Sequence, residues 1–292
     1  MTKTHGFLLA LFAATLWGLS GVCGQFLFSQ RAFNVEWLIS IRLMMAGVIL
    51  LFIAKLQNTD LFIIFKDKKD SLKLLIFSIF GMLATQYTFF KTIFYSNAPT
   101  ATVLTYFGLI FIVFYTSFIA RKIPSILEFI SLFLAMLGIF SLVTHFNLGT
   151  LVIKPDALFW GFCSAFALAT YTILPITLLF KYKATLVVGF SMLIAGIVIG
   201  VFTPLLKVEG IWDIWTVINL LVVIIPGGVM AFLAYLVSVK IIGAKYSGLV
   251  ASFEPLSAAI FTVLLLHVKL TIYDWLGGFM IVFAVVLLFF KK

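Results

Sequence analysis

The chain of 292 residues is 64% hydrophobic and only 10% charged, a composition that excludes an ordinary soluble domain. The mean hydropathy of +1.24 leaves too few polar residues for an extramembrane domain, so a soluble enzyme is excluded as well. The formal net charge of +10 would suit a nucleic-acid partner, but no basic helix face or folded polar module carries that charge. We therefore expect no nucleic-acid partner.

Apolar runs bounded by charges and turn residues predict an all-α polytopic membrane protein with ten transmembrane helices. Each run is long enough to cross the bilayer core, which takes about 20 apolar residues. In chain order the predicted helices cover residues 6–29, 35–55, 73–95, 98–120, 125–145, 157–179, 184–204, 217–240, 245–267 and 272–290. The connections between them are short, so we expect any functional site to lie within the membrane.

The distribution of basic residues predicts the orientation in the membrane. Fourteen of the twenty Lys and Arg residues fall on the side that holds the N-terminus, and four fall on the other side. Arg42 and Lys91 lie within helices and complete the set. Because basic loops stay in the cytoplasm, we expect a multi-pass protein of the cytoplasmic (plasma) membrane with both termini in the cytoplasm.

Two weak internal matches indicate a repeat. Residues 97–104 (NAPTATVL) open the fourth predicted helix, and residues 243–250 (GAKYSGLV) open the ninth, 146 positions later. Residues 42–47 in the second helix correspond to residues 191–196 in the seventh, at an offset of 149. These matches predict two five-helix halves, residues 1–146 and 147–292. Because five is odd, the second half must be inverted, as in alternating-access transporters whose substrate site lies near the membrane midplane.

Glu254 and Pro255 lie midway along the ninth predicted helix. A carboxylate at that depth costs roughly 2.5 kcal/mol or more, so it needs a partner or a purpose. The proline removes a backbone donor and frees a carbonyl group one turn earlier, which is tolerated only where protein or a cavity covers it. A buried acid beside a broken helix is our first candidate for function. The alternative is a protonated acid that hydrogen-bonds a neighbouring helix for packing.

Several motifs resemble the drug/metabolite transporter superfamily, and specifically its EamA-type exporters with ten helices. They are Leu16-Trp17-Gly18, Arg42, the small-residue openings of the fourth and ninth helices, and Glu254-Pro255-Leu256-Ser257-Ala258. The resemblance covers essentially the whole chain. It implies two inverted five-helix repeats and the movement of small metabolites, often amino acids, amines or carboxylates.

The chain also departs from this family pattern. Many members end the fourth and ninth helices with a Gly-Glu pair, where this chain has Ala120-Arg121 and Leu266-His267. Leu109 replaces a proline that members often carry in the fourth helix. We therefore expect the second half to keep the polar helix break and the first half to have lost it.

Six residues at intermediate depths on six predicted helices are our candidate substrate-binding residues: Trp17, Arg42, Gln86, Tyr106, Tyr171 and Glu254. Glu254 can bind a cation or a proton. Arg42 can pair with Glu254, bind an anion, or extend its side chain toward water at the outer face. Gln86 offers neutral hydrogen bonds, and the aromatic side chains suit flat apolar groups or a substituted ammonium. Ordinary helix packing is the alternative for Gln86 and the aromatic residues. We expect Glu128, at the start of the fifth helix, to be a solvated acid.

These observations predict a secondary transporter that exports a small zwitterion, such as an amino acid, by alternating access. The alternative within transport is uptake of an organic cation such as a quaternary amine. A membrane enzyme would need two or more catalytic groups placed together, and only Glu254 and Arg42 offer themselves, so we expect no catalytic residues. The sequence shows no metal-ligand cluster and no nucleotide-binding loop, so we expect no cofactor. The expected partners are a small-molecule substrate, the lipid bilayer and a proton as coupling ion, in a monomer or homodimer.

Overall fold

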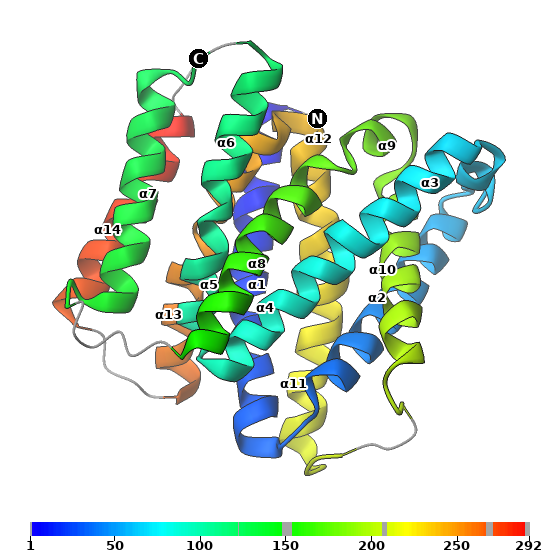
Figure 1. The fold of residues 1–292 in the computed structure, drawn as a ribbon, viewed down its shortest axis with the longest axis horizontal. Coiled ribbons are helices and arrows are strands. Elements are labelled where there is room, and N and C mark those ends of the chain that lie inside the picture. The colour runs from blue at the N-terminus through cyan, green and yellow to red at the C-terminus, as the bar shows by residue number, and fades with distance from the viewer. Residues whose placement is uncertain (1, 122, 148–153, 206–208, 267–270, 290–292) are drawn as a thin grey trace.

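A computed structural model describes residues 2–121, 123–147, 154–205, 209–266 and 271–289. Within these ranges the chain forms helices and no strands (Figure 1). The first half contains α1 (Lys3–Arg31), α2 (Val35–Leu56), η1 (Ile63–Lys66), α3 (Lys68–Ile76), η2 (Phe77–Leu83), α4 (Ala84–Tyr95), α5 (Ala98–Tyr106), α6 (Gly108–Ile119) and α7 (Ile126–Thr144). The second half contains α8 (Pro155–Ile173), α9 (Ile176–Lys181), α10 (Ala184–Val201), α11 (Ile214–Ile224), η4 (Ile225–Met230), α12 (Ala231–Ala251), α13 (Glu254–Leu266) and α14 (Ile272–Phe289).

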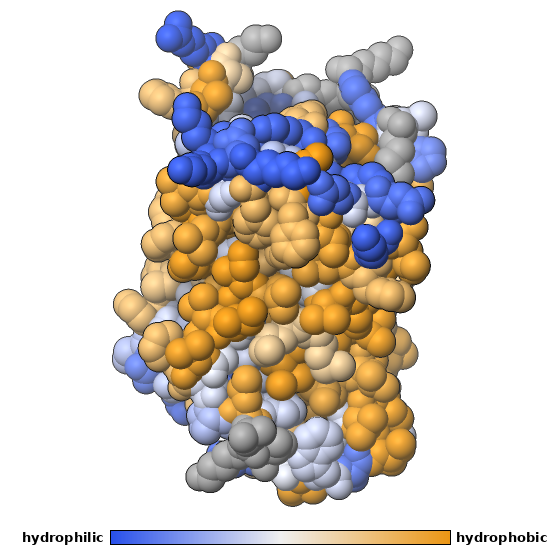
Figure 2. Space-filling model, turned by 90° about the vertical axis from the view of Figure 1, so that its right-hand side faces the viewer, coloured by the Kyte–Doolittle hydropathy of each residue, from blue (hydrophilic) through white to orange (hydrophobic). Residues whose placement is uncertain are grey.

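The described helices confirm an all-α polytopic membrane protein. Seven helical stretches in this part of the chain are long and apolar enough to cross a membrane: Lys3–Arg31, Val35–Leu56, Lys68–Tyr95, Ala98–Ile119, Pro155–Lys181, Ala184–Val201 and Ile214–Ala251. Shorter apolar helices cover Ile126–Ser141, Glu254–Leu265 and Trp275–Ala284. Figure 2 shows the corresponding surface, a wide apolar band below a belt of hydrophilic side chains at one end.

Helix ends lie where local side chains satisfy the free backbone groups. Asn34 accepts a hydrogen bond from the Trp37 backbone N–H at the start of α2, and Asn97 does the same for Thr100 in α5. Gly243, at φ +84°, lies between the eighth and ninth predicted helices, so the helical stretch that contains α12 bends there. Short polar residues and one glycine thus divide long apolar runs into separate segments.

Helices from the two halves of the chain pack directly against each other. The main pairs are α2 with α10, α7 with α14, α1 with α12 and α13, and α8 with α4, α5 and α6. Glycines permit the closest approaches: a Cβ on Gly47 would lie 2.6 Å from the backbone N of Leu193, and one on Gly196 would lie 2.7 Å from the backbone N of Met44. Small residues allow such close contact between membrane helices, where dispersion forces drive packing.

Two apolar runs are interrupted near their middles, one in each half. In the second half, α12 ends at Ala251 and α13 begins at Glu254. Pro255 explains this break, because its ring would clash with the carbonyl of Ala251, four residues earlier. In the first half, α5 ends at Tyr106 and α6 begins at Gly108, although no proline is present.

The expectation concerned the polar break, and the acid and the proline are absent from this part of the first half. The interruption there is the single residue Phe107, whose φ of −56° and ψ of −22° stay helical. Gly108, the next residue, packs closely on α8. A Cβ at this position would lie only 2.3 Å from the carbonyl oxygen of Ala165 in α8. This close backbone contact places the start of α6 directly against α8.

Candidate functional site

All six predicted site residues line one cavity at the centre of the helix bundle. They come from α1, α2, α4, α5, α8 and α13, so both halves of the chain contribute. The cavity volume is about 40 Å³, and its wall also includes Ser20, Thr85, Phe89, Thr105, Leu168 and Phe232. The structure thus brings the six residues together. Their role in substrate binding stays a prediction.

Arg42 is buried in the bundle, with 3% of its surface exposed. Its Nη1 donates to Oε1 of Gln86 at 2.9 Å. The guanidinium carbon lies 4.9 Å from the ring centre of Phe90 and 5.6 Å from that of Phe232, within the range of cation–π attraction. Arg42 therefore does not extend to an aqueous face, because these three partners hold its side chain inside.

Glu254 is the first residue of α13 and is 6% exposed. Its Oε2 accepts a hydrogen bond of 2.8 Å from the hydroxyl of Tyr106 in α5. The start of a helix is also where the helix dipole favours a negative charge. Gly18 of α1 packs on this segment, since a Cβ there would lie 2.9 Å from the Glu254 carbonyl oxygen. The helix break, the dipole and Tyr106 together position the carboxyl group at the cavity.

Arg42 and Glu254 line the same cavity but do not contact each other. In the described part of the chain, no hydrogen bond or ion pair joins them. Each is held by a neutral side chain, Gln86 for the arginine and Tyr106 for the acid. The cavity therefore presents a basic and an acidic side chain that are kept apart in a buried setting, where electrostatic interactions are strong.

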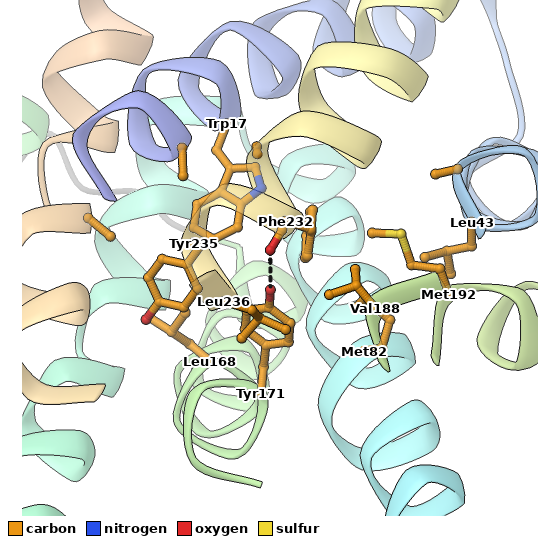
Figure 3. Packing of buried hydrophobic residues seen from close by; sticks show 14 of the residues in the cluster. Trp17, Leu43, Met82, Leu168, Tyr171, Val188, Met192, Phe232, Tyr235 and Leu236 are labelled. Atoms are coloured by element: carbon orange, nitrogen blue, oxygen red, sulfur yellow. Dashed lines mark hydrogen bonds between the residues drawn. The ribbon is translucent and has the colours of Figure 1, made fainter. Parts of the chain in front are cut away.

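Aromatic side chains form an apolar wall beside these charges. The ring of Trp17 lies 5.0 Å from each of the rings of Phe232 and Tyr235. Tyr171 stacks on Tyr235 at 5.8 Å, and its hydroxyl donates to the Phe232 carbonyl at 3.5 Å, which is the dashed line in Figure 3. The Tyr235 hydroxyl lies 2.9 Å from the Thr172 hydroxyl. The two tyrosine hydroxyls therefore already have structural partners.

Several buried polar atoms at the cavity have no hydrogen-bond partner among the residues that the structure describes. They are Nε1 of Trp17, Oγ of Ser20, Nε of Arg42 and Nε2 of Gln86. A buried donor without a partner costs about 1–3 kcal/mol, so four at one place need an explanation. Sequence reasoning missed Ser20. Its spacing of three residues from Trp17 on α1 could have identified it, because residues three apart share a helix face.

Glu128 corrects another expectation, since it is 5% exposed rather than solvated. It forms a capping box with Ser125 at the start of α7. It also accepts hydrogen bonds from Lys245 at 3.1 Å and from Tyr246 at 3.0 Å. Both partners follow the bend at Gly243, so a segment more than a hundred residues away covers this acid.

Comparison with known proteins gives the family. The chain matches the EamA-like transporter family twice, over residues 4–144 and 156–290. It is 38% identical over 286 residues to an uncharacterized inner membrane transporter, YicL, of Salmonella typhimurium strain LT2, covering 97% of this chain and 94% of that protein. A solved structure titled only as a crystal structure of a protein shares the fold, with a TM-score of 0.77 at 12% identity over 97% of this chain and 95% of that one. The chain therefore belongs to the EamA-like transporter family of multi-pass membrane proteins.

Proposed function

We propose that the chain is a secondary transporter that exports a small zwitterion, such as an amino acid, across the inner (cytoplasmic) membrane by alternating access. The observation that carries this proposal is the separation of Arg42 and Glu254, buried at 3% and 6% exposure on one cavity without contact. Charges in a bilayer are costly unless they are paired. A zwitterion would supply both missing partners, a carboxylate for Arg42 and an ammonium group for Glu254.

The small size of the cavity supports a transport cycle in which the protein changes conformation. A volume of about 40 Å³ holds one or two water molecules and is too small for an amino acid. Helices must therefore separate before a substrate can enter. The breaks at Phe107 and between α12 and α13 interrupt helices that carry Tyr106 and Glu254, so they are suitable hinges for this movement.

We further propose ten transmembrane helices arranged as two inverted halves, residues 1–146 and 147–292. The double match to one family supports it, since each match covers one half. Packing supports it too: Gly18 of α1 packs against α13, and Gly161 of α8 packs against Leu104 of α5, with a tryptophan before each glycine. An odd number of crossings in each half inverts the second half relative to the first.

The excess of basic residues on the side of the N-terminus supports an orientation with both termini in the cytoplasm. Single cysteines at Lys69 and Ile211 test it, in a chain whose Cys23 and Cys163 are replaced by alanine. We expect a membrane-impermeant thiol reagent added outside intact cells to label Ile211→Cys and not Lys69→Cys. The opposite pattern would reverse the topology.

Uptake of an organic cation is the second candidate function. The rings of Trp17, Phe232, Tyr171 and Tyr235 support it, because aromatic faces attract substituted ammonium groups. Such a substrate would use Glu254 and leave Arg42 without a ligand. In either case the carboxyl group of Glu254 is the candidate site for a coupling proton. We expect the transporter to work as a monomer or a homodimer.

Reconstitution distinguishes these functions. A thermal-shift screen of the purified protein against small metabolites first selects ligands, because a ligand that prefers the folded state raises its stability. Liposomes that contain the protein and an unlabelled ligand are then tested for uptake of the same ligand in radiolabelled form. We expect exchange of unmodified zwitterions. Exchange of quaternary amines alone would favour the cation alternative, and a chemically altered solute would contradict transport.

A further inference from the structure

The unpaired polar atoms at the central cavity are concentrated in one group of residues. In the described part of the chain, eight buried side-chain nitrogen or oxygen atoms have no hydrogen-bond partner, and four of them belong to Trp17, Ser20, Arg42 and Gln86. These residues come from three neighbouring helices, α1, α2 and α4, and all of them line the cavity. The exposure of each is 8% or less.

All four of these groups can donate a hydrogen bond. The indole of Trp17 and the guanidinium of Arg42 can only donate hydrogen bonds. Because Arg42 can only donate, the amide oxygen of Gln86 must face it, and the unpaired Nε2 of Gln86 is a donor as well. The hydroxyl of Ser20 can donate or accept. The group therefore offers four donors and needs an acceptor.

The positions of Ser20 and Arg42 converge over the π-helical segment η4. A Cβ on Gly227 would lie 2.2 Å from Oγ of Ser20 and 3.2 Å from Nη2 of Arg42. Any side chain at Gly227 would thus displace both groups. Trp17 lies one helical turn before Ser20 on α1, and Gln86 bonds directly to Arg42. All four donors therefore line one cavity, with Ser20 and Arg42 placed by the packing of Gly227 and Gln86 held to Arg42 by a buried hydrogen bond.

We propose that Trp17, Ser20, Arg42 and Gln86 form a subsite for the carboxylate group of the substrate, an inference that rests on the proposed function. The two oxygens of a carboxylate accept about four hydrogen bonds, which matches the four unpaired donors. Arg42 supplies a single positive charge and Glu254, on the same cavity, supplies none, so the site suits a monoanion. The neighbouring rings of Phe89 and Phe232 provide an apolar surface for the rest of the molecule.

The same four donors should make the site selective for ligands that carry a carboxylate. A ligand without a carboxylate would leave the donors unpaired, and sites built around a ligand's hydrogen bonds reject analogues that lack them by large factors. We expect an amine that lacks only the carboxylate to bind at least about 100-fold more weakly than the parent amino acid.

The test compares matched probes on the whole protein in lipid nanodiscs. Each set contains an amino acid, its decarboxylated amine, its carboxamide and the corresponding acid without the ammonium group. Separate sets carry an aromatic, an aliphatic or a hydroxyl side chain. Inorganic phosphate is a separate probe. Trp17→Phe and Ser20→Ala each remove one donor, and Trp37→Phe and Ser78→Ala are matched controls, since those side chains donate to backbone carbonyls away from the cavity.

We expect Trp17→Phe and Ser20→Ala each to weaken binding of the carboxylate-bearing probes by about tenfold. Ser20→Ala should leave amine binding unchanged, whereas for Trp17→Phe, which also alters the aromatic surface, the readout is a loss of carboxylate affinity relative to amine affinity. The two controls should bind like the parent. Equal carboxylate affinity in the parent and in both variants would overturn the subsite, as would an absence of carboxylate binding to the parent. Phosphate binding as strong as carboxylate binding would overturn the selection of a monocarboxylate. Failure of the proposed function is a distinct result, because carboxylates would then bind to the protein but would not exchange across liposomes.

Discussion

Charged residues at the ends of the bundle and charged residues at its centre are arranged in opposite ways. At the ends, oppositely charged side chains contact each other directly: Arg31 of α1 lies 2.7 Å from Asp213 before α11, and Lys66 lies 2.8 Å from Asp60. Lys181 of α9 pairs with Asp70 of α3. These pairs join helices or fasten loops, and their partly exposed positions keep each contribution small.

At the centre, Arg42 and Glu254 are both buried, whereas each of these end pairs has at least one partly exposed member, and yet the central residues are kept apart. Gln86 and Tyr106 hold them in place with neutral hydrogen bonds. A fold that needed these charges only for stability would bring them into contact, as it does at the ends. This difference supports the proposal that Arg42 and Glu254 are available for a ligand, whereas the charged residues at the ends of the bundle pair with one another.

Replacing Glu254 is the strongest test of this difference between the centre and the ends of the bundle. We expect Glu254→Gln to reduce exchange of both zwitterions and amines by at least about 100-fold, since a buried charge worth roughly 3 kcal/mol to the bound substrate is lost. The measurement is radiolabelled exchange in liposomes at matched protein content. Glu36→Gln is the control, because Glu36 pairs with Lys91 away from the cavity and should retain exchange close to the parent level. Full activity of Glu254→Gln would show that the central charge has no special role.

The position of the acid depends on the contact between α1 and α13. A Cβ on Gly18 would lie 2.3 Å from Oγ of Ser257 and 2.6 Å from the backbone N of Ala258. We expect Gly18→Ala to destabilise the protein by about 1–3 kcal/mol and to impair exchange, because α13 must move away. The check is thermal unfolding in detergent together with exchange. Gly21→Ala is the matched control on the same helix, with no atom closer than 3.7 Å to the added methyl group. Equal effects of the two variants would mean that general helix propensity, and not this contact, is responsible.

The neutral partner of Glu254 provides a finer test. Tyr106→Phe keeps the ring and removes the hydroxyl that donates to the carboxyl group at 2.8 Å. A hydrogen bond to a charged group contributes about 1.5–3 kcal/mol, so we expect at least a tenfold loss of affinity in a binding assay. Tyr235→Phe removes an equally buried hydroxyl whose partner is Thr172, and it should change affinity much less. If the two variants behave alike, Tyr106 does not position the acid.

The smallest effect is expected for the ion pair of Arg31 and Asp213, at one end of the helix bundle. The pKa of the Asp213 carboxyl is lowered, chiefly because the Thr216 backbone N–H donates to it, and also because of its bond to Arg31. A carboxyl whose pKa is lower in the folded state stabilises the protein above its unfolded pKa of about 3.9, and this contribution is lost as the pH falls through the folded pKa. We expect the melting temperature to fall less steeply below about pH 4 in Asp213→Asn than in the parent. Identical curves would show that the pair contributes nothing to acid stability.

The sequence was sufficient to predict the class of fold and six of the residues that line the cavity. Long apolar runs with polar ends predict membrane helices, and the physical cost of a buried Glu254 or Arg42 marks these residues as unusual. Local signals such as Pro255 also locate one helix break correctly. All of these properties depend on residues that are close together in the chain.

The partners of the buried charges could not be predicted, because they depend on contacts across the fold. Tyr106 and Glu254 are 148 residues apart, and the pairing of Gln86 with Arg42 spans 44 residues. The interruption at Phe107 has no adjacent proline to reveal it, and it lies next to the close contact between Gly108 and α8. From the sequence alone, Glu128 resembles a solvated acid at a helix end, because nothing nearby in the chain shows that the segment after Gly243 covers it.

The central claim is that Arg42 and Glu254 bind opposite ends of one substrate. Its most direct test is the exchange of an amino acid and of its decarboxylated amine, measured side by side in liposomes for the parent and for Arg42→Gln. We predict that the parent prefers the amino acid, and that Arg42→Gln loses at least about 100-fold of amino-acid exchange while amine exchange stays at the parent level. Amino-acid exchange by Arg42→Gln at the parent rate would contradict the claim and leave only the cation alternative.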